Sequence, residues 1–213
     1  MRDLFRGQLV RLTGEDPETR AKVEVRWERD TEYHRLADGD PAQLWSEKKM
    51  KEWMEKRLER QNLHEFSIRS LADDRLIGAV GLSVDWPRRD SMVGIAIGER
   101  DLWGKGYGTD AMRLVLLYAF TELNLRRVTL ATHGYNTRAR RSYEKVGFQF
   151  EGVMRLDQLK EGRRSDSIFM GILYEEWLAI NGLTSGQADL SGRAGEIVSS
   201  ASAGPCSRAH HSP

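Results

Sequence analysis

The chain has 213 residues, and its 33 Lys and Arg residues nearly cancel its 32 Asp and Glu residues to leave a net charge of +1. This length suits one domain with its own core plus a tail rather than two full domains, and the balanced charge provides no basic field for a nucleic acid. The single cysteine, Cys206, excludes an intramolecular disulfide, a multi-cysteine zinc site and a thiol nucleophile in the central part of the chain.

No apolar run reaches the roughly 20 residues that a membrane-spanning helix needs, and the first residues lack the apolar segment of a signal peptide. We therefore expect a cytoplasmic protein that does not bind membranes.

The N-terminal part is predicted to contain one strand and then helices. Apolar and polar residues alternate over residues 8–12, and the turn residues after them lead to Pro17, which predicts a short helix. Residues 18–35 carry many charges with only a weak helical period. Residues 42–61 fit a helix better, because Trp and Met side chains recur there at helical spacing and are expected to pack in the core.

An antiparallel meander is predicted next. Residues 65–71 and 76–84 form a hairpin around an Asp-Asp turn, and residues 92–98 form the third strand. Further along the chain, residues 125–132 are predicted to form a strand, and residues 136–145 a helix. Residues 148–156 and 165–173 are predicted to close the sheet as a hairpin.

The glycine-rich stretch over residues 100–109 follows the third strand. Gly104, Gly106 and Gly108 permit positive φ and allow several backbone N–H groups to face one ligand. A helix predicted over residues 110–123 points its N-terminus at this loop, where orphan N–H groups and the helix dipole favour an anion. The stretch is therefore predicted to bind phosphate, or to be simply a glycine-rich entry to the helix.

Two other phosphate-binding loops do not match this spacing. The dinucleotide fingerprint needs a third glycine where Thr109 stands, and a Walker loop needs four residues, not five, between its glycines.

Residues 183–213 are rich in Gly, Ser and Ala and poor in large apolar residues, so they are predicted to form a disordered tail. His210 and His211 lie in this tail and are not expected to bind a metal.

Two motifs resemble those of the GCN5-related N-acetyltransferases (GNAT family). The stretch over residues 103–108 is similar to the acyl-CoA loop Q/R-x-x-G-x-G/A, with Trp103 in place of the usual Gln or Arg. A second signature, N-x-x-A-x-x-x-Y-x-K-x-G-F, is matched in step by Asn136, Ala139, Tyr143, Lys145, Gly147 and Phe148.

This resemblance covers residues 8–178 and is closest in layout to the ribosomal-protein N-terminal and spermidine acetyltransferases. It implies one α/β domain over residues 1–182. The implied GNAT fold has a mixed, mostly antiparallel sheet that is split between two central strands, helices on both faces, and acetyl-CoA in the split.

The resemblance also implies where acetyl-CoA binds. Its pantetheine arm would pair with the backbone of Ala96, Ile97 and Gly98, and an N–H near Ile97 would stabilise the oxyanion. Asn136 resembles the family's asparagine that hydrogen-bonds the CoA arm, and it can also cap a helix. The cradle for the pyrophosphate would comprise Trp103, Gly104, Lys105, Gly106, Tyr107, Gly108 and Thr109.

Tyr143 is predicted to be the general acid for the departing thiolate, the alternative being a packing role. A neutral tyrosine, with a pKa of about 10, can donate a proton to a thiolate whose thiol has a pKa of about 8.5. The predicted reaction is direct attack by a primary amine, with no covalent enzyme intermediate and no metal. The candidates for the general base are Glu99, His133, Asp30, Glu32 and His34, or a chain of water molecules.

A protein N-terminal amine is the expected acceptor, on the resemblance. A polyamine or an antibiotic-like small amine is the alternative, and Asp30, Glu32, Asp38 and Asp40 could bind its charges. A non-catalytic acyl-CoA-binding module is the hypothesis from another class. Nucleic-acid binding through Arg138, Arg140 and Arg141 is a poorer one, and sheet-edge pairing would allow a homodimer.

Overall fold

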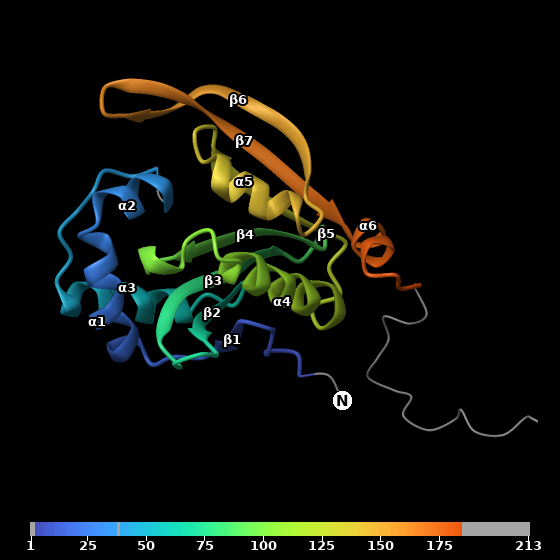
Figure 1. Ribbon diagram of the computed structural model, residues 1–213, viewed down its shortest axis with the longest axis horizontal. Coiled ribbons are helices and arrows are strands. Elements are labelled where there is room, and N and C mark those ends of the chain that lie inside the picture. Colours follow the sequence, from blue (N-terminus) through green and yellow to red (C-terminus); the bar gives the residue numbers. More distant parts are fainter. Residues whose placement is uncertain (1–2, 38, 185–213) are drawn as a thin grey trace, which may run out of the picture.

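The computed structural model describes residues 3–37 and 39–184, and Figure 1 shows a central sheet with helices around it. The strands are β1 (Val10–Thr13), β2 (Leu63–Ser70), β3 (Leu76–Asp85), β4 (Asp90–Ile97), β5 (Arg127–His133), β6 (Gln149–Lys160) and β7 (Arg163–Leu173). The helices are α1 (Pro17–Glu28), α2 (Thr31–Ala37), α3 (Glu47–Leu58), the 3-10 turn η1 (Arg100–Leu102), α4 (Tyr107–Thr121), α5 (Thr137–Glu144) and α6 (Tyr174–Ile180).

The strands form one sheet in the order β1-β2-β3-β4-β5-β7-β6. Neighbouring strands are antiparallel except β4 and β5, which run parallel. This parallel pair joins only residues 90–92 to residues 127–129, so the two central strands separate beyond that point. The predicted fold, a mostly antiparallel sheet split between its central strands, is confirmed.

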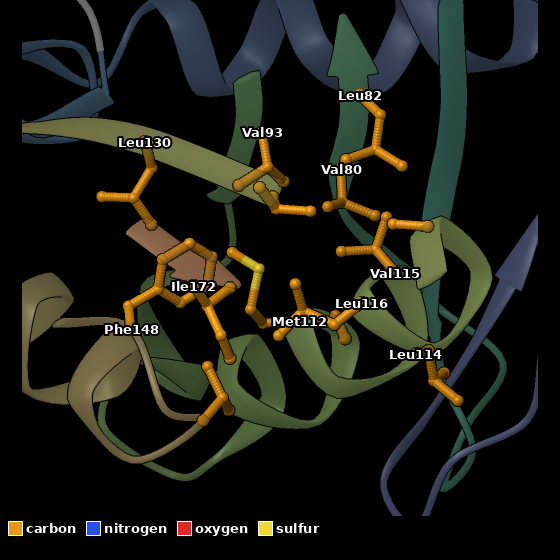
Figure 2. Packing of buried hydrophobic residues seen from close by; sticks show 14 of the residues in the cluster. Val80, Leu82, Val93, Met112, Leu114, Val115, Leu116, Leu130, Phe148 and Ile172 are labelled. Atoms are coloured by element: carbon orange, nitrogen blue, oxygen red, sulfur yellow. The ribbon is translucent and has the colours of Figure 1, made fainter. Parts of the chain in front are cut away.

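The two sheet faces pack against different helices. Val80 and Leu82 of β3 meet Met112 and Val115 of α4 in the main core, which Figure 2 shows. Glu65 of β2, whose side chain lies on the opposite face, binds a side chain of α1 instead. The alternation of side chains along a strand thus separates an apolar face under α4 from a face covered by α1 and α3.

That second face contains partly buried ion pairs as well as apolar contacts. Arg20 of α1 bonds Glu24 at 2.5 Å and Glu65 at 3.0 Å, and Arg57 of α3 bonds Glu65 at 3.1 Å. Trp27 of α1 packs with apolar residues of α2 and β3 in a small cluster of its own. These contacts hold the N-terminal helices to the sheet beside the split.

The N-terminal helices differ in length from the prediction. Helix α1 is a full 12-residue helix, because Asp16 accepts a hydrogen bond from the Thr19 N–H at 2.9 Å and Pro17 occupies its first turn. The helix predicted over residues 42–61 begins only at α3, where Ser46 accepts from the Lys49 N–H at 3.2 Å.

The predicted apolar face of α3 is only partly correct. Met50 and Met54 are buried against α1, whereas Trp53 is 39% exposed and Leu58 is 64% exposed. The other residues of α3 are charged, so only Met50 and Met54 form its buried apolar face.

Helix α6 was not predicted, because it follows β7 without an intervening turn. Glu176 accepts a hydrogen bond from the Leu173 N–H at 2.8 Å, which fixes the start of the helix. Trp177 and Leu178 are then buried in the main core. The acidic pair Glu175–Glu176 before these apolar residues was the available signal.

Of the predicted tail, the structure describes only Leu183, which packs against the main core, and Thr184. Cys206, His210 and His211 lie outside the described residues. Among the residues that the structure describes, no helix is long and apolar enough to cross a membrane.

Candidate active site

The separation of β4 from β5 opens a cavity of about 590 Å³ in the middle of the sheet. Its walls come from β4, the loop before α4, α5, the end of β5, and the segment around α2. All predicted site residues except Gly98 and Lys105 line it, namely Ala96, Ile97, Trp103, Gly104, Gly106, Tyr107, Gly108, Thr109, Asn136 and Tyr143.

The N-terminus of α4 faces this cavity without a side-chain cap. Its first intrahelical bond runs from the Asp110 N–H to the Gly106 carbonyl at 2.9 Å, so the N–H groups of Tyr107, Gly108 and Thr109 have no acceptor within the helix. Gly106 reaches this position with φ of 95°, which glycine adopts readily. The cluster of N–H groups can therefore bind an anion.

Asp110, the acid in this first turn, does not compete for those N–H groups. Its carboxylate accepts hydrogen bonds from the N–H groups of Leu9 at 2.7 Å and Val10 at 3.1 Å. The negative charge is thereby held on the β1 side of the helix, and the helix also anchors the N-terminal strand.

Trp103 stands where the family motif has Gln or Arg, and an arginine stacks on its ring. Its indole N–H donates to the Ile97 carbonyl at 2.7 Å, and the Arg138 guanidinium stacks 4.0 Å from its ring centroid. Burial lowers the pKa of Arg138, an effect that Glu32 partly offsets. Arg138 lines the cavity and is a partly desolvated cation that an anion would stabilise.

The free edge of β4 provides backbone groups along the split. The Gly98 N–H donates to Ile77 of β3 at 2.8 Å, and the antiparallel register pairs Ala96 with Ala79. Because hydrogen-bonding direction alternates along such a strand, the backbone groups of Ile95 and Ile97 face the split. The role predicted for the N–H near Ile97, stabilising an oxyanion, remains a prediction.

Gly98 and Lys105 have other surroundings. A Cβ atom on Gly98 would lie 2.0 Å from Cδ2 of Trp27, so this glycine allows α1 to approach β4. The Lys105 N–H donates to the Leu102 carbonyl at 3.4 Å. Their predicted roles in binding the cofactor remain predictions.

Tyr143 lies on α5 with its ring edge-on to Phe148, at 6.0 Å between centroids. No residue in the described part of the chain hydrogen-bonds its hydroxyl. Burial raises the pKa of Tyr143 to about 12, so the hydroxyl keeps its proton at neutral pH.

Asn136 is the N-cap of α5, as predicted. Its side-chain oxygen accepts from the Ala139 N–H at 3.1 Å, and its amide N–H donates to the Leu36 carbonyl at 3.2 Å. The residue thus ties α5 to the segment after α2 at the rim of the cavity. A contact with the CoA arm stays a prediction.

Four of the five candidate bases are held in other interactions. Arg100 holds the pKa of Asp30 below its usual value by bonding its carboxylate, and also binds Glu32 at 2.9 Å. Glu99 accepts from the Trp27 indole at 2.9 Å, and His34 contacts Glu28 at 3.1 Å.

Only the fifth candidate base, His133, lines the cavity. In the described part of the chain, no Asp or Glu does. Asp38 lies outside the described residues, and the backbone carbonyl of Asp40 contacts a ring nitrogen of His34 at 3.0 Å.

The sequence did not identify the wall opposite the loop. Tyr33 and Leu36 of α2, with Gly39 beyond it, and Gln158 and Ser167 of the β6–β7 hairpin also line the cavity. The hairpin tip contacts the α2 segment through Arg35 and Glu161, at 3.8 Å, and it rises above α2 in Figure 1. No local motif indicates these contacts, because they join segments that lie far apart in the sequence.

Comparison with known proteins agrees with this geometry. Residues 8–149 match the model of the acetyltransferase (GNAT) domain. The Bacillus subtilis (strain 168) protein "Probable N-acetyltransferase YjcK" is 35% identical over 128 residues, which is 59% of this chain and 70% of that protein. The "Putative ribosomal N-acetyltransferase YdaF" of the same strain is 33% identical over 108 residues, or 50% of this chain and 58% of that protein.

A solved structure of spermidine N-acetyltransferase from Vibrio cholerae, in complex with CoA and spermine, has the same fold. It superposes with a TM-score of 0.71 and 24% identity, over 80% of this chain and 98% of that one.

Proposed function

The chain belongs to the GNAT acetyltransferases, and on that premise we propose that it transfers an acetyl group from acetyl-CoA to a protein N-terminal amine by direct attack. The proposal is supported mainly by three features that line one cavity. These are the uncapped N-terminus of α4, the free edge of β4 and the hydroxyl of Tyr143.

The residues present fit acetyl-CoA. The N–H groups of residues 107–109 and the Arg138 guanidinium would bind its pyrophosphate, because oriented N–H donors and a stacked cation both favour phosphate oxygens. The backbone of Ile95 and Ile97 would pair with the amides of its pantetheine arm. When bound, acetyl-CoA supplies the acetyl group as a reactive thioester.

Tyr143 serves as the general acid. Its hydroxyl is neutral at pH 7, because burial raises its pKa to about 12. This value exceeds the usual thiol pKa of about 8.5, so a complete proton transfer in isolation would be uphill by several kcal/mol. Tyr143 therefore acts as a hydrogen-bond donor that passes on a proton released by the amine, rather than as a strong acid.

The charges around the cavity favour an acceptor with one ammonium group. A polyamine carries several positive charges, which require carboxylates once they leave water. The described lining contains Arg138, Arg141 and Lys145 but no Asp or Glu. The name of the YdaF relative refers to ribosomal N-acetylation, which agrees with a protein N-terminus, whereas the spermidine enzyme shares the fold at 24% identity.

Thiol release from acetyl-CoA with three acceptors tests this proposal. The acceptors are a lysine-free peptide with a free N-terminus, a peptide with a blocked N-terminus and one lysine, and spermidine. We expect release with the first peptide and much less with the other two. Faster release with spermidine would favour the polyamine alternative. Binding of acetyl-CoA without release on any amine would favour a non-catalytic module.

A further inference from the structure

A bulge in β6 brings a carboxylate to the wall of the cavity. The register of the β6–β7 pair shifts between Met154, which lies opposite Ser167, and Gln158, which lies opposite Ser165. Leu156, within the bulge, has φ of 55°, and its N–H donates to the Asp166 carboxylate at 2.8 Å. The strand is therefore reshaped at this bulge, and the bond to Asp166 fixes it there.

The bulge directs Asp157 toward two residues that line the cavity. The Ser167 hydroxyl donates to the Asp157 carboxylate at 2.6 Å, and the Gln158 amide donates to the same oxygen at 2.7 Å. These two bonds lower the pKa of Asp157, and the neighbouring His133 contributes to the effect. A solvent-exposed carboxylate thus lies one hydrogen bond from two residues that line the cavity.

His133 lies directly across the sheet from Ser167. The Gly134 N–H donates to the Asp166 carbonyl at 2.8 Å, which makes the next pair, His133 and Ser167, a non-hydrogen-bonded pair. In such pairs the side chains come closest, with Cα atoms about 4.5 Å apart. Both side chains line the cavity that contains Tyr143.

The His133 ring is also held on its other side. It stacks on Tyr135 with 5.1 Å between ring centroids and 10° between planes. The Tyr135 hydroxyl donates to the Arg35 carbonyl at 2.7 Å, which fixes the stacking partner. A stacked imidazole opposite Ser167 has a defined orientation before any acceptor arrives.

We propose that His133 is the general base that removes a proton from the incoming ammonium, with Ser167 and Asp157 as positioning residues. The inference rests on the proposed function. The N–H bond of the ammonium breaks and the proton binds a ring nitrogen of His133, which leaves a neutral amine with a lone pair and an imidazolium. The amine is then able to attack, and the imidazolium later returns its proton to water.

The charges that face His133 fit this role. The Asp157 carboxylate, reached through Ser167, stabilises an imidazolium. Arg138 and Arg141 of α5 and Lys145 directly after it line the cavity, where the phosphates of acetyl-CoA would offset positive charge. A histidine is the side chain whose ordinary pKa lies closest to neutral pH, so it can accept and release a proton during turnover.

The test uses two peptide acceptors that differ in the N-terminal side chain and therefore in the basicity of the N-terminal amine. In the second peptide, a fluorinated N-terminal side chain lowers the amine pKa, so the amine is already neutral at pH 7. For His133→Gln at pH 7 we expect kcat to fall roughly tenfold with the ordinary peptide, because only about a tenth of its N-terminal amine is already neutral. With the fluorinated peptide we expect little change, because its amine needs no deprotonation before attack. A merely structural role would reduce both rates equally.

Two further variants examine the positioning residues. Asp157→Asn removes the charge that favours the imidazolium, so the acidic limb of the kcat/KM profile should move to lower pH. Ser167→Ala should produce the same shift. Ser165→Ala is the matched control, because Ser165 lies on the same strand, makes no hydrogen bond through its hydroxyl within the described structure and does not line the cavity.

The outcomes separate this inference from the proposed function. A wild-type protein that acetylates neither peptide nor any other amine refutes both. An active wild type with His133→Gln unchanged, or equally impaired with both peptides, refutes the inference alone. Thermal unfolding and acetyl-CoA affinity of each variant show whether an impaired variant is still folded and still binds acetyl-CoA.

Discussion

Replacing Tyr143 with phenylalanine removes one hydroxyl from the cavity and leaves the packing against Phe148 in place. Burial raises the pKa of Tyr143 to about 12 in the folded protein, whereas an unfolded tyrosine titrates near 10. Below pH 10 the hydroxyl is neutral in both states and does not affect the pH dependence of stability. Between pH 10 and 12 the unfolded chain loses the proton first, so the folded state becomes relatively less stable.

The magnitude follows from these two pKa values. At pH 11.5 the difference in ionisation costs the wild type about 2 kcal/mol of unfolding free energy relative to pH 8. Tyr143→Phe lacks this contribution. Urea unfolding of both proteins at the two pH values measures it, because all other titrating groups are common to the pair and cancel in the difference.

Turnover gives the second readout of the same substitution. We expect kcat to fall roughly 100-fold, as is typical when a positioned proton donor is removed, while acetyl-CoA affinity changes little. Equal alkaline losses of stability in the two proteins would refute the buried environment assigned to Tyr143. Unchanged kcat would refute its role as the general acid.

Two further substitutions test the packing and the charge at the site. Gly98→Ala places a Cβ atom 2.0 Å from the Trp27 ring and should lower the unfolding free energy by about 1–3 kcal/mol. The control is Gly94→Ala, whose Cβ atom would meet no atom within 4 Å. Equal unfolding free energies of the two variants by urea titration would contradict the close contact between Gly98 and Trp27. Arg138→Gln should weaken acetyl-CoA binding roughly tenfold and reduce its salt dependence. Arg140→Gln is the matched control, because Arg140 pairs with Glu144 at 2.9 Å and lies outside the cavity lining. If calorimetry finds the same loss of acetyl-CoA affinity in both variants, Arg138 has no specific role in binding.

The parts of the site that depend on local chemistry were predictable from the sequence. Gly104 and Gly106 predicted the turn before α4, although the helix begins at Tyr107 rather than at residue 110 and so includes Gly108. The side chain of Asn136 predicted the start of α5. The strands of the meander alternate in polarity, so their faces followed from a period of two. Each of these features depends on neighbouring residues, and the structure reproduces each one.

Features that depend on long-range contacts were not predictable in this way. The register shift in β6 brings Asp157 to Ser167, and the stacking of Arg138 on Trp103 joins two segments far apart in the sequence. Neither leaves a periodic or compositional signal. The extent of α1 was missed because ion pairs such as Arg20 with Glu65, rather than an apolar stripe, hold it to the sheet.

The proposed function requires the N-terminus of α4 to bind the phosphates of acetyl-CoA. Gly108 lines the cavity in the first turn of this helix, and a Cβ atom there would meet only Ile97, at 3.6 Å. Gly108→Asp therefore introduces a negative charge where the anion should bind, in a position that stabilises a helix. Gly108→Asn has the same shape without the charge.

Calorimetric titration of acetyl-CoA into the wild type and these two variants is the most direct measurement. We predict that the wild type binds, and that Gly108→Asp weakens binding at least about tenfold more than Gly108→Asn, a difference of roughly 1.4 kcal/mol. A wild type that does not bind acetyl-CoA, or three proteins with equal affinity, would show that the N-terminus of α4 does not bind its phosphates.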